Sequence, residues 1–268
     1  MSTIISVAIQ KGGVGKTTTV VNTAHALAEM GLRILVIDMD PQHNTSTLLA
    51  STTPYELPHT LVDLMSNPDM PMSSCIFPTQ YPNLSLVSSH IDLFGEVSLN
   101  PDPYKILCLK AKLNREPYLL EQFDYIFLDT PPHLGGVFVN NALSISHYYI
   151  LPVEAESYYA LKGINQFMVN VNAMKSTVNP NLELLGVLIT MVDLRTTVAT
   201  NMVEAIRRFF GEEKVFRTMI TRNTAINRAV IERKSILAYD GRTSGAKDYR
   251  EFARELHAKV TNASQADI

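Results

Sequence analysis

The residues best suited to chemistry form a glycine-rich run at positions 10–18, with the sequence QKGGVGKTT. Glycines let the backbone curl so that successive amide groups point toward a bound phosphate, and a following lysine can reach the β- and γ-phosphates. A neighbouring threonine hydroxyl suits Mg²⁺. The run predicts nucleotide binding, with Lys16 on the phosphates and Thr17 on the metal. The expected nucleotide contacts in this loop are Lys11, Gly12, Gly13, Val14, Gly15, Lys16, Thr17 and Thr18.

Aspartates end two of the apolar segments, at Asp38 and Asp129, and Asp40 stands two residues beyond the first. Because side chains alternate along a strand, Asp38 and Asp40 fall on the same side. Mg²⁺ takes oxygen ligands, and attack on a γ-phosphate needs a positioned water. Carboxylates near a phosphate loop can therefore either bind the metal or position the water. An aspartate after a strand is also a common turn former. Together with the glycine-rich run, the spacing favours a metal and water site.

The elements that must carry these residues follow from the hydrophobic pattern. Short apolar runs alternate with longer segments of 3.6-residue periodicity, which is typical of βαβ units wound into a parallel sheet. In such sheets ligands bind at the carboxyl ends of the strands. We expect an α/β fold: a doubly wound, mostly parallel sheet with helices on both faces, as in P-loop NTPases. The predicted strands are residues 4–9, 33–38, 84–88, 125–129, 148–153, 184–192 and 215–219, and the predicted helices are 16–30, 104–113, 137–145, 159–175, 197–210 and 245–258.

A proline-rich stretch at residues 54–82 interrupts this pattern and holds six of the 14 prolines. With 268 residues, the chain could form one large domain or two small ones, and the stretch could be a linker. The strand pattern resumes directly after it, so we expect a single domain over residues 1–268 with a surface excursion at about 54–82 that holds at most a short helix at 60–66. Residues 261–268 are expected to fray.

The glycine-rich run departs from the general phosphate-loop pattern, because Gln10 stands where that pattern has its first glycine and Lys11 is added. This deviant Walker A form resembles the ParA/Soj/MinD family of dimerising ATPases. The segment from Asp38 to Gln42 looks like the family's Walker A′ element, and Asp129 with the following Thr-Pro-Pro looks like Walker B. The resemblance extends from Ile4 to about residue 260 and is closest to the short partition ATPases, which lack an N-terminal helix-turn-helix.

The resemblance implies a Mg²⁺-dependent ATPase that hydrolyses ATP to ADP and phosphate. Asp40 would position the hydrolytic water, and Asp129 would bind Mg²⁺ with Asp38 nearby. Lys11 would cross the interface of an ATP-bound homodimer to reach the partner's phosphates, acting in catalysis with Lys16 and Asp40.

The formal net charge of −3 conceals an asymmetry. Residues 200–259 carry 13 Lys and Arg against 8 Asp and Glu, a local charge of +5, whereas the rest of the chain carries −8. Such an excess can mark a nucleic-acid face, although helix surfaces also carry interleaved charges. The resemblance implies nonspecific DNA binding through Arg195 and Arg222, with Arg228 in place of an arginine that relatives carry at Ala225. The loop of Arg222 and Asn223 is also where the family contacts adenine, so its role stays open.

The resemblance therefore predicts an ATPase for plasmid or chromosome partitioning, in which ATP closes a DNA-binding dimer and a ParB-like centromere-binding partner stimulates hydrolysis. The alternative is a membrane-associated regulator of the MinD kind, but the C-terminal tail is too polar for an amphipathic anchor, and no membrane binding is expected. The two cysteines lack metal-site spacing, which argues against a nitrogenase-type reductase. With no signal peptide or apolar span evident, we expect a cytoplasmic, nucleoid-associated protein.

Overall fold

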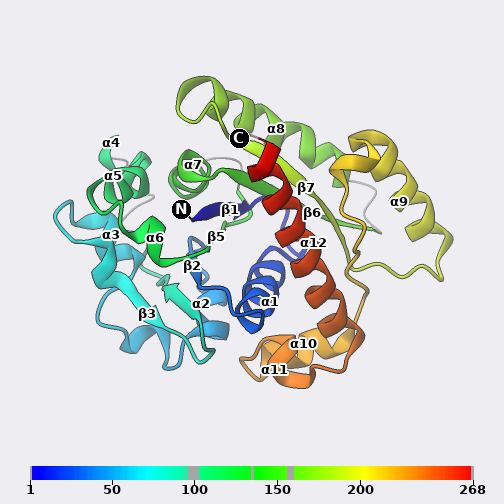
Figure 1. Ribbon diagram of the computed structural model, residues 1–268, viewed down its shortest axis with the longest axis horizontal. Coiled ribbons are helices and arrows are strands. Elements are labelled where there is room, and N and C mark those ends of the chain that lie inside the picture. The colour runs from blue at the N-terminus through cyan, green and yellow to red at the C-terminus, as the bar shows by residue number, and fades with distance from the viewer. Residues whose placement is uncertain (1, 94, 96–102, 134–135, 156–159, 267–268) are drawn as a thin grey trace.

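The computed structural model describes residues 2–93, 95, 103–133, 136–155 and 160–266. These residues form a seven-stranded sheet in the order β3-β4-β2-β5-β1-β6-β7 (Figure 1). All neighbouring strands are parallel except β3, which pairs antiparallel with β4 at one edge. The strands are β1 (Thr3–Val7), β2 (Ile34–Asp38), β3 (Ile76–Pro78), β4 (Leu84–Val87), β5 (Tyr125–Asp129), β6 (Tyr148–Glu154) and β7 (Glu183–Thr190).

Helices cover both faces of this sheet, as the alternation of strands and helices predicts (Figure 1). One face carries α1, α12, α10 and α11, and the other carries α3, α5, α7, α8 and α9. The α-helices are α1 (Lys16–Glu29), α2 (Asn44–Leu49), α3 (Leu61–Ser66), α4 (Pro103–Ile106), α5 (Cys108–Arg115), α6 (Leu119–Gln122), α7 (Gly136–Ile145), α8 (Ala160–Thr177), α9 (Thr197–Phe210), α10 (Thr224–Ile231), α11 (Ile236–Asp240) and α12 (Ser244–Ala266). The short 3₁₀ helices are η1 (Pro54–Glu56), η2 (Met72–Cys75) and η4 (Glu212–Lys214).

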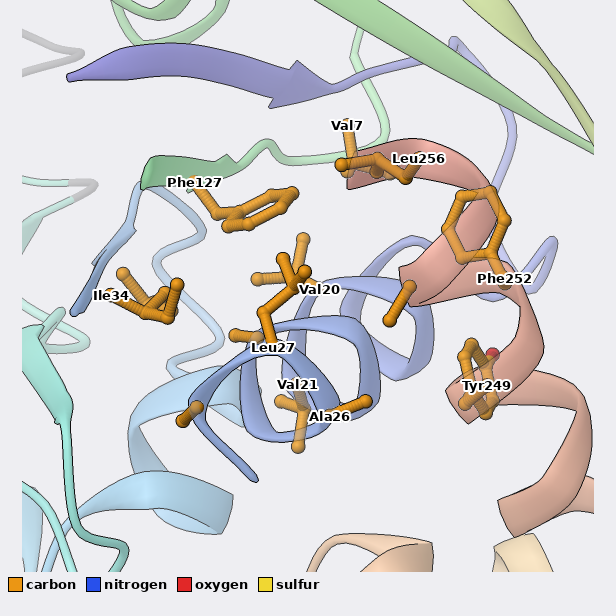
Figure 2. Packing of buried hydrophobic residues seen from close by; sticks show 14 of the residues in the cluster. Val7, Val20, Val21, Ala26, Leu27, Ile34, Phe127, Tyr249, Phe252 and Leu256 are labelled. Atoms are coloured by element: carbon orange, nitrogen blue, oxygen red, sulfur yellow. The ribbon is translucent and has the colours of Figure 1, made fainter. Parts of the chain in front are cut away.

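Helices α1 and α12 pack against each other and against the centre of the sheet. Figure 2 shows Val20 and Leu27 of α1 beside Phe127 of β5, with Phe252 and Leu256 of α12 completing the cluster. All five side chains are fully buried. Burial of an aliphatic or aromatic side chain of this size contributes about 1.5–3 kcal/mol. The packing fixes the helix that begins at the glycine-rich loop relative to the strand ends.

The proline-rich segment differs from the expected surface excursion. Its residues Leu61 and Leu64 on α3 are fully buried in the core, and β3 forms the edge of the sheet. The short helix is confirmed: Thr60 and Asp63 form a capping box that satisfies its first amides. Prolines between its short elements end each of them early, so the sequence of the segment resembles a loop. The segment nevertheless contributes side chains to the core.

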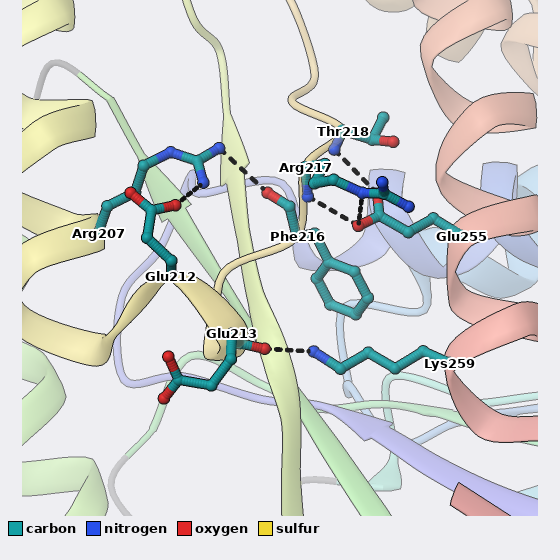
Figure 3. A network of polar contacts seen from close by, with 8 residues as sticks. All are labelled: Arg207, Glu212, Glu213, Phe216, Arg217, Thr218, Glu255 and Lys259. Atoms are coloured by element: carbon teal, nitrogen blue, oxygen red, sulfur yellow. Dashed lines mark hydrogen bonds and ion pairs between the residues drawn. The ribbon is translucent and has the colours of Figure 1, made fainter. Parts of the chain in front are cut away.

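The strand predicted at residues 215–219 is wrong. Val215 makes a single bridge to β7, and the ladder ends there because the backbone amides of Arg217 and Thr218 donate to the carboxylate of Glu255 on α12, at 2.7 and 2.8 Å (Figure 3). The amides of Phe216 and Ile220 still donate to the β7 carbonyls of Val187 and Ile189, at 3.0 and 2.9 Å, so β7 holds both ends of the segment and Glu255 holds the amides between them.

Other differences lie at helix ends. The predicted helix at 104–113 is divided into α4 and α5, and α12 continues to Ala266, well into the tail that was expected to fray. The short helices α2, α10 and α11 were not predicted. Each holds eight or fewer residues, which is too few turns for a clear periodic pattern. None of the described helices is both long and apolar enough to cross a bilayer.

Candidate nucleotide-binding site

The glycine-rich run connects the end of β1 to the first turn of α1, as the sequence predicts. Gly13 and Gly15 have φ angles of 76° and 87°, in the left-handed region that favours glycine. Val14 between them is buried in the core, and its carbonyl accepts a hydrogen bond from the Thr190 hydroxyl at the end of β7. The loop is therefore fixed at its middle. The structure places Lys11, Gly12, Gly13, Val14, Gly15, Lys16, Thr17 and Thr18 together at this junction.

Lys16 lies over the loop rather than in solvent. Its Nζ donates to the carbonyl of Lys11 at 2.7 Å, and the residue is 8% exposed. Burial lowers the pKa of Lys16, while the nearby carboxylates of Asp129 and Asp40 act in the opposite direction. A buried ammonium group beside open backbone amides is suited to binding a phosphate chain.

Asp129 is the metal-ligand candidate with the clearest geometry. It is fully buried at the end of β5, and its Oδ2 accepts hydrogen bonds from the hydroxyls of Thr17 and Thr45, both at 2.7 Å. Its Oδ1 is buried and has no hydrogen-bond partner among the described residues. Burial raises the pKa of Asp129 to about 6, and the hydrogen bonds from the two threonines oppose this rise. An oxygen left without a partner in this way is placed to bind a cation.

Asp38 lies next to Asp129, since the two residues are register partners in the sheet. Its Oδ2 accepts hydrogen bonds from the backbone amide and the hydroxyl of Ser46, at 2.8 and 2.7 Å, and its Oδ1 accepts from the amide of Asp40 at 3.1 Å. Burial raises the pKa of Asp38 well above its ordinary value, and the charge of Asp129 adds to this effect. Through these hydrogen bonds Asp38 holds α2 and Asp40 in place. Its role as a metal ligand remains a prediction.

Asp40 faces an open cleft, as a residue that positions water must. It is 9% exposed, and its Oδ1 accepts from the amide of Gln42 at 3.0 Å. The cleft has a volume of about 640 Å³. It is lined by Asp40, Pro41, Gln42, Ile91, Asp92, Gly95, Pro132 and His133. The carboxylate therefore lies between a space that admits water and the buried groups of the loop.

Lys11 and Arg222, far apart in the sequence, meet at one carboxylate. Lys11 Nζ lies 3.1 Å from Glu154 Oε2, and Arg222 Nη2 lies 3.9 Å from Glu154 Oε1. Glu154 and Thr45 were not among the residues predicted from the sequence. Glu154 could have been found as a third carboxylate at the end of a strand, whereas the hydroxyl run that holds Thr45 carries no comparable signal.

A smaller cavity of about 150 Å³ adjoins the phosphate loop on its other side. It is lined by Gly15, Thr18, Thr190, Met191, Ile220, Thr221, Arg222, Asn223, Ile226, Asn227 and Tyr249. Arg222 and Asn223 thus line a cavity beside the phosphate loop, and their contact with a nucleotide base stays a prediction. The asparagine also caps α10, because its Oδ1 accepts from the amide of Ala225 at 2.8 Å.

The basic residues of the C-terminal third differ in how they are paired. Arg195 is exposed, but it forms a two-pronged ion pair with Asp193, at 2.7 and 2.8 Å. Arg207 pairs with Glu212, and Lys259 donates to the carbonyl of Glu213 (Figure 3). In the described part of the chain, seven cations of this region have no carboxylate partner: Arg208, Lys214, Arg228, Arg233, Lys247, Arg254 and Lys259.

No cluster of three or more His, Cys, Asp or Glu side chains suited to a metal occurs among the described residues. Zinc and iron sites usually require such a cluster. Mg²⁺ in nucleotide sites does not, because it takes one or two protein oxygens and completes its shell with phosphate and water. The site is therefore consistent with Mg²⁺ bound together with a nucleotide.

Comparisons with known proteins agree with this geometry. A family model described as an AAA domain matches residues 2–184. The sporulation initiation inhibitor protein Soj of Bacillus subtilis is 36% identical over 96% of this chain and 99% of its own length. The chromosome partitioning protein ParA of Myxococcus xanthus is 35% identical over 97% of this chain and 90% of its own length. The structure of cobyrinic acid a,c-diamide synthase from Mycobacterium smegmatis with bound ADP and magnesium matches 95% of this chain and 93% of that chain, with a TM-score of 0.78 and 32% identity.

Proposed function

Since this chain belongs to the family of Soj and ParA chromosome partitioning ATPases, we propose that it is an ATP-switched ATPase for DNA segregation. ATP with Mg²⁺ closes a homodimer that binds DNA without sequence preference, and a ParB-like centromere-binding partner stimulates hydrolysis and release. The proposal depends on one observation: the phosphate loop lies beside Asp38, Asp40 and Asp129 at the carboxyl ends of the central strands β1, β2 and β5.

The residues at these strand ends fit a magnesium ion. Asp129 has a buried oxygen without a partner, and the Thr17 hydroxyl that donates to its other oxygen can turn to present a lone pair. When bound, Mg²⁺ would neutralise negative charge on the β- and γ-phosphates. Thr17 and Asp129 would hold it, with Asp38 fixing the segment that follows β2.

The chain's own residues supply the remaining tasks of hydrolysis. Asp40 faces the cleft and can accept a hydrogen bond from a water, orienting it toward the γ-phosphorus. Lys16 already lies at the loop and offsets the charge of the phosphates. Lys11 is 28% exposed at its side chain, and it reaches a second subunit's nucleotide only after leaving Glu154.

DNA binding is supported by the distribution of paired and unpaired cations. Of the three residues predicted to contact DNA, Arg195 and Arg222 lie beside carboxylates, whereas Arg228 is exposed on α10 with no acidic partner in the described chain. Lysine and arginine bind phosphates in any sequence through counterion release. We therefore assign Arg228 the leading role among the three, with Arg208 and the other cations that lack a carboxylate partner in support.

The MinD-like alternative would need an apolar helix face free to enter a membrane surface. The described apolar residues of α12 are otherwise engaged: Tyr249, Phe252, Leu256 and Val260 are buried against the core. Strong ATP-dependent sedimentation with anionic liposomes would favour the membrane role. We expect no more sedimentation with liposomes than without them.

The variant Asp40→Ala separates binding from turnover. We expect it to dimerise with ATP, because the phosphate loop and Lys16 are intact, and to hydrolyse ATP far more slowly than the wild type. Light scattering measures dimerisation, and phosphate release measures turnover. Hydrolysis at the wild-type rate would show that Asp40 does not position the water.

A further inference from the structure

The turn that follows Asp40 ends in an uncommon backbone conformation. His43 has a φ angle of 44°, in the left-handed region that residues other than glycine seldom adopt. Its amide donates to the carbonyl of Asp40 at 2.8 Å, which closes the turn, and the amide of Gln42 donates to the Asp40 carboxylate at 3.0 Å. The direction of the carboxylate therefore depends on the conformation of His43, and such a conformation needs contacts that hold it.

The side chain of His43 is held through both of its ring nitrogens. The Thr47 hydroxyl donates to the backbone carbonyl of His43 at 3.0 Å, so its oxygen accepts from Nδ1 of the same histidine, at 3.2 Å. A neutral imidazole carries a single N–H, and Nε2 is then an acceptor. The Tyr55 hydroxyl donates to this Nε2 at 3.1 Å. The ring is thus fixed from two directions, and Tyr55 supplies the contact from outside the turn and α2.

Tyr55 reaches His43 from a firmly placed segment. It lies at the centre of η1, whose first residue, Pro54, is buried. A proline at the first helical position already has the φ angle of a helix. The amide of Glu56 donates to the carbonyl of Thr53 at 3.0 Å and closes the short turn. The position of the Tyr55 hydroxyl is therefore set by the backbone of η1.

Tyr55 also contacts a second segment of the cleft wall. Its ring packs edge to face against His90, with ring centres 4.8 Å apart, and against His43, with ring centres 5.5 Å apart. His90 comes directly before Ile91, which lines the cleft together with Asp40. The Tyr55 side chain is 60% exposed, so these directed contacts, rather than burial, are its contribution to the structure.

We propose that Tyr55 is a positioning residue for ATP hydrolysis: it holds His43, and through His43 it aims the Asp40 carboxylate at the water in the cleft. A small loss of orientation at a reacting group lowers the rate of the chemical step. Because the Tyr55 hydroxyl acts on the turn after Asp40, its loss should change turnover more than the binding of ATP. The inference rests on the role of Asp40 in the proposed function and adds the residue that supports it.

The variant Tyr55→Phe tests this inference, because it keeps the ring and removes only the hydroxyl. We expect kcat to fall about fivefold, the effect of losing one hydrogen bond between neutral groups, while KM for ATP stays within about twofold of the wild type. Phosphate release with ATP and Mg²⁺ gives both constants on the full chain, at a protein concentration where light scattering shows the same dimer content. Tyr118→Phe is the matched control: this tyrosine is also exposed, its hydroxyl donates to Glu116, and its loss should leave kcat unchanged.

A double-variant cycle shows whether the hydroxyl acts through His43. Asparagine tolerates the left-handed conformation, and its amide can still donate to Thr47, but it is too short to reach Tyr55. His43→Asn alone should therefore lower kcat about as much as Tyr55→Phe does, and adding Tyr55→Phe to it should cause no further loss. A second loss of about fivefold in the double variant would overturn the inference, since the hydroxyl would then act by another route.

The outcomes separate this inference from the proposed function. An Asp40→Ala variant that hydrolyses ATP at the wild-type rate overturns the role of Asp40 and this inference together. A slow Asp40→Ala variant, combined with a Tyr55→Phe variant whose kcat stays within about twofold of the wild type or whose KM alone changes, overturns the role of Tyr55 only. A lower kcat in Tyr55→Phe, an unchanged kcat in Tyr118→Phe and no further loss in the double variant with His43→Asn support it.

Discussion

Replacing Thr45 by valine tests how the buried carboxylate of Asp129 is stabilised. The Thr45 hydroxyl lies 2.7 Å from Asp129 Oδ2, and both residues are fully buried. Valine has nearly the same shape but cannot donate, so the carboxylate keeps only the bond from Thr17. A hydrogen bond to a charged group is worth about 1.5–3 kcal/mol, and we expect Thr45→Val to lower the free energy of unfolding by about 2 kcal/mol. For a chain of this size that corresponds to about 5 °C in the unfolding temperature.

The measurement is urea unfolding of the nucleotide-free protein at neutral pH, followed by circular dichroism. Thr45→Ser keeps the hydroxyl and loses one methyl group, a change of about 0.8 kcal/mol, so serine should be clearly less harmful than valine. Mg²⁺-dependent nucleotide affinity should fall for valine and recover for serine, because the hydroxyl also orients Asp129. A valine variant within about 0.5 kcal/mol of the wild type would refute the reasoning.

Three further changes have defined outcomes. Burial lowers the pKa of His25 below that of a free histidine. The neutral His25 side chain therefore stabilises the fold fully above about pH 6.5, and this stabilisation is lost as the pH falls through the lowered pKa. The unfolding temperature of the wild type should fall more steeply below pH 6.5 than that of His25→Gln. Arg228→Ala should weaken ATP-dependent DNA binding and reduce the slope of log affinity against log salt by about 1. Arg195→Ala should change the slope less, because the Arg195 guanidinium is already paired with Asp193 in the wild type. Equal slopes in the two variants would contradict this ranking. Glu154→Gln removes a partly exposed ion pair with Lys11. Because this pair competes with phosphate for the lysine, its removal should raise ATP affinity about fivefold in titration calorimetry. Unchanged affinity would show that the pair does not compete with phosphate.

The sequence predicts the parts of this protein that depend on local pattern. The strands that carry Asp38 and Asp129 are apolar runs followed by turn residues, and both end at the predicted residues. The strand before the phosphate loop is also present, but it ends at Val7, two residues before the predicted end. The sheet class also follows, because alternating strands and helices leave few other arrangements. The Arg222 and Asn223 loop could be placed near the nucleotide only through the resemblance.

Contacts between distant residues were not predictable in the same way. Glu154 meets Lys11 across 143 positions, and Thr45 meets Asp129 across 84. Neither pair leaves a trace in local periodicity, because each depends on which strands are neighbours in the sheet. The core role of the proline-rich segment was missed for a related reason: short elements such as α3 bury their residues through tertiary packing, which outweighs local composition.

The proposed function is tested most directly by retention of nonspecific DNA with ATP, with ADP and without nucleotide, across a salt series. We expect retention only with ATP and Mg²⁺, falling steeply as salt increases, because the dimer places the cations of two subunits on one duplex. Equal retention in all three nucleotide states would contradict the ATP switch. It would leave an ATPase whose nucleotide does not control DNA.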